Sequence, residues 1–277
     1  MTELIDDAAA DRALKTKHRA LWASGDYNAV ASEVIPHLGT RLVAATGIGA
    51  GQRVLDIAAG SGNAAIPAAL TGATVVASDL TPELFDAGRH VAKLRGAELE
   101  WDEADAENLP YADGAFDATI SVVGIMFAPH HQAAADEMLR VTRSGGTVAH
   151  ISWTPAGFIG QLFATLKPYA PPPPPGASPA PLWGDADHVN ALFGDRVTDV
   201  RAEAQQLQIT RFATAAEFRD FFKAFYGPTI AVYKNIADDP DKVAELDEAL
   251  VALGERFGIG AGPVSEWEYL LYTAVKV

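Results

Sequence analysis

The chain has 277 residues, of which 49% are hydrophobic, and it carries a formal net charge of −15 at pH 7. This surplus of carboxylates disfavours nucleic acids and anionic membrane surfaces as partners, because both are bound by clustered Lys and Arg side chains. The chain has no cysteine, which excludes disulfides and thiolate metal sites, and we expect no metal centre. Without an apolar signal segment or a membrane-length apolar run, we expect a cytoplasmic protein.

Helices come first along the chain, and strands alternate with helices after them. Apolar residues recur at helical spacing over residues 8–46, with a break at Gly25 and Asp26. Strands are predicted at 54–57, 74–78, 99–102, 118–122 and 147–152. Helices are predicted at 63–70, after a capping Thr81, and near 132–141. Repeated alternation of this kind predicts a parallel sheet covered on both faces.

The pattern changes after residue 153. The segment "YAPPPPPGASPAP" at 169–181 predicts an extended linker on the surface, because proline cannot continue a helix or a central strand. Two long alternating stretches, 197–212 and 266–277, predict strands that pair antiparallel at one edge of the sheet. Between them, helices are expected at about 215–226, 228–236 and 242–257, as an insertion spanning about 214–257.

A glycine-rich loop follows the first strand in "VLDIAAGSGNAAI", residues 54–66. Gly60, Gly62 and Ala65 fit the G-x-G-x-x-G/A pattern of loops that hold nucleotide cofactors between a strand and a helix. Asp79 ends the next strand about 20 residues later, where a carboxylate can bind ribose hydroxyls. The spacing predicts a ligand that contains a nucleoside, and both NAD and S-adenosylmethionine satisfy it.

Two features favour S-adenosylmethionine. Asp56 ends the first strand, where a carboxylate suits a cationic ligand but repels a pyrophosphate. Asp105 lies where it can accept the amino proton of an adenine, and Ala106 can supply a backbone N–H. Both belong to "DAENLPYADGAFD", which follows the third predicted strand.

The sequence resembles the class I S-adenosylmethionine-dependent methyltransferases, especially the group similar to the enzymes of ubiquinone and menaquinone biosynthesis. The matching stretches are "VLDIAAGSGN", "VVASDLTPELF", "DAENLPYADGAFD" and "EMLRVTRSGGTV", which together span residues 51–153. Ala58 departs from the family's pattern, which has its first glycine there. We expect this alanine to alter the packing of the loop only slightly.

The resemblance implies a Rossmann-like α/β fold in one domain over residues 1–277. A seven-stranded, mostly parallel sheet would end in an antiparallel C-terminal strand pair. Residues 1–46 would form a helical cap and 47–153 the half that binds the cofactor. Residues 154–277 would form the acceptor side, with the helical insertion before the last strand.

The resemblance also implies roles for single residues. Around the cofactor, one set would border the methionine moiety, a second the ribose and adenine, and a third the sulfonium. These sets are Gly60, Ser61, Gly62 and Asn63, then Asp79, Leu80, Asp105 and Ala106, and finally Ser121 and Val122. Trp22 and Tyr27 in the N-terminal helices are candidates to close over the cofactor, with packing of the cap on the sheet as the alternative.

Methyl transfer from a sulfonium is an in-line displacement, so the protein mainly aligns the reactants and excludes water. A carboxylate acceptor needs no general base, whereas an alcohol does. His130 and His131, in the loop after the fourth strand, are the candidate bases. Candidates for an apolar acceptor pocket are Phe127, Trp153, Phe222 and Tyr226, although core packing also explains these aromatic residues.

The leading hypothesis is O-methylation of a lipophilic small molecule, either at a carboxylate such as that of a fatty acid or at a hydroxyl. Methylation at carbon or nitrogen of a quinone-like metabolite is the alternative within the family. An NAD-dependent oxidoreductase and a cofactor-binding protein without catalysis are more distant alternatives. The expected partner is one apolar small molecule, and the protein is expected to be a monomer or a homodimer.

Overall fold

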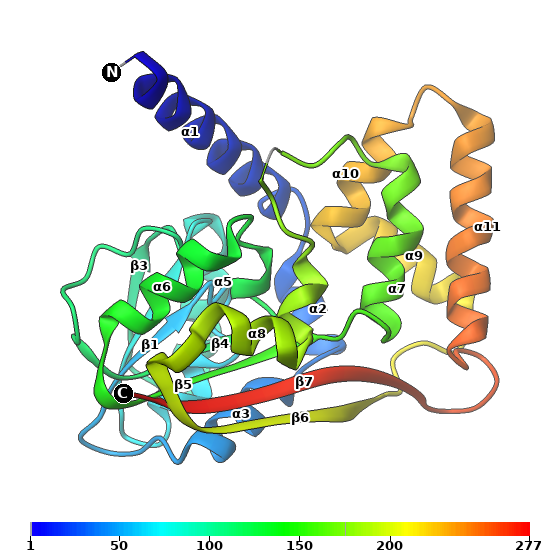
Figure 1. Ribbon diagram of the computed structural model, residues 1–277. Coiled ribbons are helices and arrows are strands. Elements are labelled where there is room, and N and C mark those ends of the chain that lie inside the picture. Colours follow the sequence, from blue (N-terminus) through cyan, green and yellow to red (C-terminus); the bar gives the residue numbers. More distant parts are fainter. Residues whose placement is uncertain (1, 175) are drawn as a thin grey trace.

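A seven-stranded sheet runs through the molecule in the order β3-β2-β1-β4-β5-β7-β6 (Figure 1). The computed structural model describes residues 2–174 and 176–277. Strand β7 is antiparallel to both β5 and β6, and the other described pairs are parallel. This confirms the predicted fold class. The strands are β1 (Arg53–Ile57), β2 (Thr74–Asp79), β3 (Glu100–Glu103), β4 (Phe116–Val122), β5 (Thr142–Trp153), β6 (Val197–Ile209) and β7 (Ser265–Lys276).

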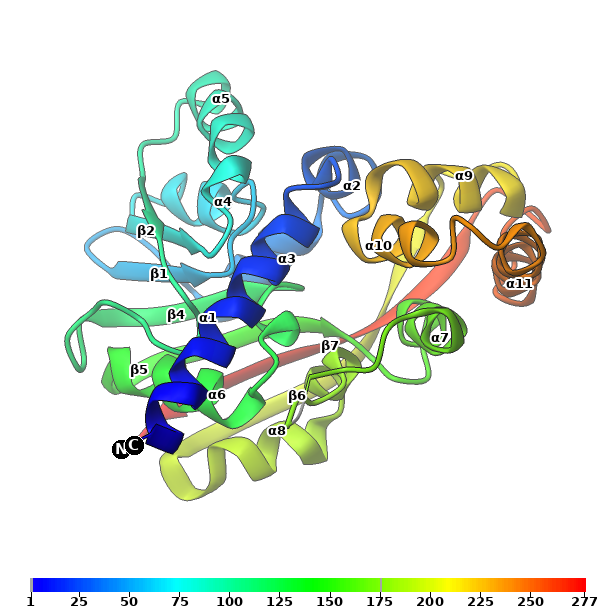
Figure 2. The same cartoon turned by 90° about the horizontal axis from the view of Figure 1, so that it is seen from above.

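Helices cover both faces of the sheet (Figure 2). On one face lie α3 (Leu38–Thr46), α4 (Ala65–Ala69), which contacts β1 and β2, and α5 (Phe85–Arg95). On the other face lie α6 (His131–Val141), which contacts β4 and β5, and α8 (Ala186–Phe193), which contacts α6. The central strands are therefore buried on both faces, as their nearly continuous apolar sequences require. No helix in the described residues is long and apolar enough to cross a membrane.

The N-terminal cap consists of α1 (Thr2–Trp22), α2 (Tyr27–Glu33) and α3. The predicted break at Gly25 and Asp26 is confirmed, and the Asp26 side chain caps α2 by accepting a hydrogen bond from Ala29 N. A Cβ atom at Gly25 would lie 2.3 Å from Phe225 O. Glycine at this position therefore lets the turn between α1 and α2 approach the inserted helices. A second break before α3 was not predicted, although Pro36 within it disfavours a continuous helix.

A block of helices lies beyond one end of the sheet (Figure 1). It contains α7 (Phe158–Leu166), α9 (Ala215–Phe225), α10 (Gly227–Asn235) and α11 (Pro240–Arg256), which contact one another, and α10 also contacts α1. The three predicted insertion helices are confirmed, whereas α7 and α8 were not predicted. Between them, Pro171, Pro172 and Pro173 of the predicted linker are exposed, and Pro175 lies outside the described residues.

Single-turn 3-10 helices complete the chain, and one of them corrects a prediction. They are η1 (Pro82–Leu84), η2 (Ile125–Phe127), η3 (Lys167–Tyr169), η4 (Ala180–Gly184) and η5 (Gly194–Arg196). The Thr81 hydroxyl was expected to cap the helix after β2, but it makes no capping hydrogen bond. Instead the Asp79 carboxylate accepts a hydrogen bond from Thr81 N at 2.8 Å, because Asp side chains readily bond the backbone two residues later.

Two neutral histidines lie buried beneath α8. His131, at the start of α6, has its Nδ1 2.9 Å from His188 Nε2, and His150 of β5 is fully buried between Trp183 and Tyr272. Burial lowers the pKa of His131 to about 4 and that of His150 to about 3. Because both pKa values lie below the unfolded value, the unfolded chain takes up the protons first as the pH falls, and the folded state loses stability below pH 6.5.

We therefore expect His131→Gln to flatten the acid dependence of stability. The free energy of unfolding of the wild type should fall relative to that of the variant by about 1.4 kcal/mol per pH unit between pH 6.5 and 4. Urea denaturation at several pH values measures this difference. His90→Gln, at an exposed position of α5, is the control. A difference that does not change with pH would show that His131 is not held neutral.

Candidate functional site

A cavity opens at the carboxyl ends of the parallel strands, where ligands bind in sheets of this kind. We call it the main cavity. Each of β1, β2, β3 and β4 contributes residues at or just after its end, and α1 and Tyr27 close the cavity from above. Among the lining residues are Lys15, His18, Trp22, Tyr27, Ala58, Gly60, Asn63, Asp79, Leu80, Asp105, Ala106, Val122, Val123 and Phe127.

Two buried carboxylates hold the glycine loop. Asp79 Oδ2 accepts a hydrogen bond from Gly60 N at 2.8 Å, and Asp56 Oδ2 accepts one from Ala65 N at 2.7 Å. Gly60 has a φ of +56°, and a Cβ atom there would touch the Tyr27 ring at 3.4 Å. The backbone of the loop is thus fixed from below by acids and covered from above by one aromatic ring.

The floor of the main cavity contains two strained residues. Ala58 and Val123 have φ values of 55° and 46°, which residues other than glycine rarely adopt. They follow β1 and β4, and a Cβ atom on the neighbouring Gly124 would lie 2.2 Å from Ala58 O. Close contact between the two turns therefore maintains the strained conformations, which are concentrated at the cavity.

Two polar groups beside the loop lack partners among the described residues. Asp56 Oδ1 is a buried acceptor, and Asn63 Nδ2 is a buried donor that belongs to the cavity lining. Unpaired buried polar atoms are rare in folded proteins. An acceptor and a donor at the two ends of one loop match the ammonium and the carboxylate of an amino-acid moiety. The residues present therefore fit the methionine part of S-adenosylmethionine.

Burial also sets the protonation of these acids. Asp56 is 1% exposed, and desolvation raises its pKa to about 8; the hydrogen bond from Ala65 N opposes this shift, and repulsion by the nearby Asp79 carboxylate adds to it. Desolvation raises the pKa of Asp79 as well, although the hydrogen bonds from Gly60 and Thr81 oppose the shift. At neutral pH Asp56 is therefore mostly protonated until a cation arrives nearby.

Ion pairs fasten α1 over the main cavity. Lys15 Nζ contacts Asp105 Oδ1 at 3.0 Å and also Glu107, and one turn later Arg19 contacts Glu83 and Glu103. Burial would raise the pKa of Glu107, but hydrogen bonds from Lys15 and His130 outweigh it and lower the pKa. Asp105 thus holds α1 through Oδ1, while its Oδ2 has no hydrogen-bond partner among the described side chains and backbone groups.

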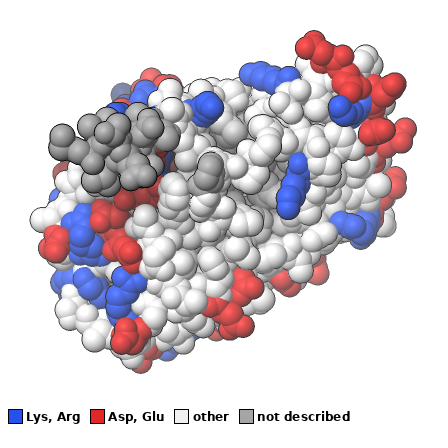
Figure 3. All heavy atoms as spheres, turned by 45° about the horizontal axis from the view of Figure 1, so that its top comes forward, with Lys and Arg blue, Asp and Glu red and all other residues white. Residues whose placement is uncertain are grey.

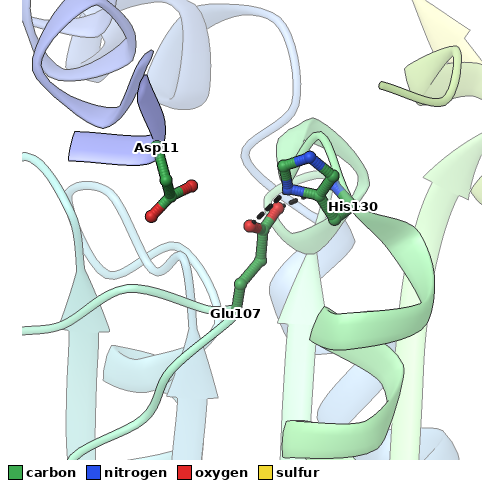
Figure 4. Close-up of side chains that lie close together, drawn as sticks. All are labelled: Asp11, Glu107 and His130. Atoms are coloured by element: carbon green, nitrogen blue, oxygen red, sulfur yellow. Dashed lines mark hydrogen bonds and ion pairs between the residues drawn. The ribbon is translucent and has the colours of Figure 1, made fainter. Parts of the chain in front are cut away.

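Asp11, Glu107 and His130 approach one another at the outer edge of this contact (Figure 4). Their potential ligand atoms lie within 4.8 Å of one another, which is compatible with a metal ion. However, Glu107 Oε2 already binds His130 Nδ1 at 2.9 Å and the Lys15 ammonium. A divalent cation would have to displace Lys15, so this cluster serves to hold α1 in place.

A smaller space, which we call the annex, adjoins the main cavity and shares Tyr27, Val123 and Phe127 with it. The annex has a volume of about 20 Å³, against about 80 Å³ for the main cavity. None of its lining residues is charged. They are Tyr27, Val30, Val34, Ile35, Val123, Phe127, Trp153, Ile159, Phe222, Tyr226 and Trp267.

Most of the residues predicted from the sequence meet in these two spaces. The exceptions in the cofactor set are Asp56, Ser61, Gly62 and Ser121, which line neither space and support the loop from behind. A Cβ atom at Gly62 would lie 2.7 Å from the Trp101 ring, and Ser121 Oγ donates a hydrogen bond to Ile57 O. Ser61 is buried beside them. Neither candidate base lines either space: His130 bonds Glu107, and His131 faces His188.

Sequence reasoning missed Lys15 and Trp267 and gave His18 no role. Lys15 contacts residues about 90 positions away, which no local pattern reveals. His18 and Trp22 follow Lys15 at helical spacing, and all three line the main cavity. That spacing was the only signal in the sequence that could have identified them together.

Comparison with known proteins identifies the family of the chain. A family model described as a methyltransferase domain matches residues 55–150. The uncharacterized protein Rv1405c of Mycobacterium tuberculosis is 51% identical over 269 residues, which cover 97% of each chain. A demethylmenaquinone methyltransferase of a Mycobacterium species is 40% identical over 126 residues, which cover 44% of this chain and 50% of that protein.

Among solved structures, the fold is similar to that of a phosphoethanolamine N-methyltransferase of Haemonchus contortus in complex with S-adenosyl-L-methionine. The TM-score is 0.51 at 18% identity, over 86% of this chain and 52% of that one. This likeness shows the fold, and the methyltransferase family model supports the expectation of S-adenosylmethionine rather than NAD. Resemblance to the menaquinone group in particular covers less than half of the chain.

We predict that Asp56 makes cofactor affinity depend on pH. A cationic ligand favours the ionised carboxylate, so the affinity for S-adenosylmethionine should rise by up to about tenfold per pH unit below pH 8. Calorimetry at pH 6, 7 and 8 measures this rise, and buffers of different ionisation enthalpy measure the proton released. In Asp56→Asn, the only pH dependence of the affinity that remains should be the one caused by the ligand's own amino group. Identical pH profiles for the wild type and the variant would refute the role of Asp56.

Proposed function

Because the chain belongs to the class I S-adenosylmethionine-dependent methyltransferases, we propose that it methylates a lipophilic small molecule at oxygen. The observation that carries this proposal is the annex, an uncharged and largely aromatic space that adjoins the cofactor cavity. Pockets for small molecules are typically apolar, with a few polar groups that orient the ligand.

Bound S-adenosylmethionine supplies an electrophilic methyl group on a sulfonium. The residues of this chain bind and orient it. Asp79 would accept hydrogen bonds from the ribose hydroxyls, and Asp105 and Ala106 would form hydrogen bonds with the adenine edge. Asn63 would bind the methionine carboxylate. Trp22 and Tyr27, whose ring centroids lie 5.7 Å apart in an edge-to-face contact, line the main cavity and would cover the bound cofactor. Excluding water prevents the loss of the methyl group to hydrolysis.

The aromatic residues between the two spaces suit an apolar acceptor. The ring centroid of Trp22 lies 4.6 Å from that of Phe127 and 6.0 Å from that of Tyr226. Helix α1, η2 and the start of α10 therefore meet beside the main cavity. Large molecules are less suitable acceptors. Figure 3 shows Lys and Arg side chains scattered among Asp and Glu on one face, without the continuous basic band that a nucleic acid needs.

The annex is closed in this structure, because about 20 Å³ holds little more than one water molecule. An acceptor therefore has to displace the aromatic side chains of α9 and α10. Such opening steps often limit turnover. Methylation at carbon of a quinone-like ring is the second candidate, and the partial match to the demethylmenaquinone methyltransferase favours it.

We expect activity to rise with the length of the acceptor chain. Each methylene buried in the annex adds about 0.8 kcal/mol, or nearly fourfold in apparent affinity, until the space is full. Transfer of labelled methyl groups to a homologous series of carboxylic acids and alkylphenols measures this. Val30→Phe, which fills part of the annex, should shorten the longest acceptor tolerated, whereas Ser32→Phe on the exposed face of α2 should not. A flat response, or a preference for small polar acceptors, would contradict an apolar annex.

The same assay tests the candidate base. Glu107 bonds Nδ1 of His130 and so leaves Nε2 to accept a proton. We expect His130→Gln to slow methylation of a phenol by about 100-fold or more but to leave a carboxylate nearly unaffected. His131→Gln should slow methylation less than His130→Gln does, because Nδ1 of His131 faces His188. Equal slowing of both acceptors would exclude His130 as a base.

A further inference from the structure

Trp267, a residue of the annex lining, carries an unused hydrogen-bond donor. The residue lies near the start of β7, its side chain is 1% exposed, and its indole is part of the annex lining. Its Nε1–H has no acceptor among the described residues. Polar groups buried this deeply are nearly always bonded, so this one requires an explanation.

The surroundings of the indole offer it no oxygen. Phe158 stacks on the ring with the two centroids 4.2 Å apart. Trp153 and Phe222 approach it edge to face, with centroid distances of 6.1 and 6.0 Å. These contacts stabilise the ring but leave the N–H without a strong acceptor. Trp183 is also buried with an unpartnered Nε1, but it lies against His150 and does not belong to the annex.

The annex also limits the charge of any occupant. None of its lining residues carries a charge that could compensate a buried carboxylate or phosphate. An occupant that satisfies the indole must therefore present an uncharged oxygen. A saturated alkyl chain would fill apolar space but leave the donor unpaired, so it would gain no hydrogen bond from Trp267.

We propose that the annex binds the far end of the methyl acceptor and that Trp267 Nε1–H donates a hydrogen bond to a neutral oxygen there, such as the carbonyl of a quinone or ketone. This inference rests on the proposed function and deepens it, because it selects acceptors that carry a carbonyl over plain fatty acids. Trp267 would then determine specificity and take no part in the chemistry of transfer.

The test compares two probes of the same shape, 2-methyl-1,4-naphthoquinone and 2-methylnaphthalene, each added with S-adenosylhomocysteine. The chain has no cysteine, so the quinone cannot alkylate a thiol. In ¹⁵N-labelled protein, the indole signal that is absent from Trp267→Phe belongs to Trp267. That signal should move downfield with the quinone and stay close to its position with the arene.

Affinities provide the second measurement. Trp267→Phe should bind the quinone about tenfold more weakly than the wild type and the arene equally well. Trp183→Phe, which removes a buried unpartnered indole outside the annex, should change neither. Equal quinone affinity in the wild type and Trp267→Phe, an indole signal that does not move, or failure of the quinone to bind would each overturn the proposal.

The proposed function is judged separately, by transfer of labelled methyl groups. Transfer to lipophilic acceptors at equal rates in the wild type and Trp267→Phe, without an indole shift, would keep the methyltransferase and remove the role of Trp267. A quinone-dependent indole shift without methyl transfer to any acceptor would keep the binding site and contradict the proposed reaction.

Discussion

The hydrogen bond from Gly60 N to Asp79 Oδ2 is the interaction on which the arrangement of the site depends. It ties the loop after β1 to the end of β2, and Thr81 N adds a second bond to the same carboxylate. A buried acid thereby fixes the two loops that a nucleoside must contact. The cost is a desolvated carboxylate with a raised pKa, next to a second one at Asp56. A ligand with cationic groups compensates that cost, whereas a pyrophosphate would add to it.

The cap and the inserted helices complete the site from opposite directions. Lys15 and Arg19 hold α1 to the loops after β2 and β3, and Trp22 at the end of α1 reaches the aromatic residues of η2 and α10. Close approach between the two groups of helices requires glycines, because a Cβ atom at Gly227 would lie 2.7 Å from Leu21 O. Trp22 thus joins α1 directly to Phe127 and Tyr226 of the annex wall.

Local patterns predicted the elements from β1 to β5 because each signal lies within one short stretch, such as Gly60 and Gly62 after an apolar strand. Helix α7 was missed because "FIGQLFATL" is only nine residues long and mostly apolar, and so short an apolar run can form either a strand or a buried helix. The left-handed conformation of Val123 has no signature in its residue type. Lys15 and Trp267 were missed because their importance comes from contacts between distant segments. The two spaces of the site could therefore be outlined from the sequence, but not their polar contacts.

A crystal structure of the protein with S-adenosylhomocysteine tests the central claim most directly. The ligand should lie in the main cavity beneath α1, with its ribose at Asp79, its adenine between Leu80 and Asp105, and its amino-acid end over the loop between Asp56 and Asn63. Asp79 should keep its hydrogen bond to Gly60 N. A ligand bound elsewhere, or a cavity left empty at saturating ligand, would contradict the assignment of this site.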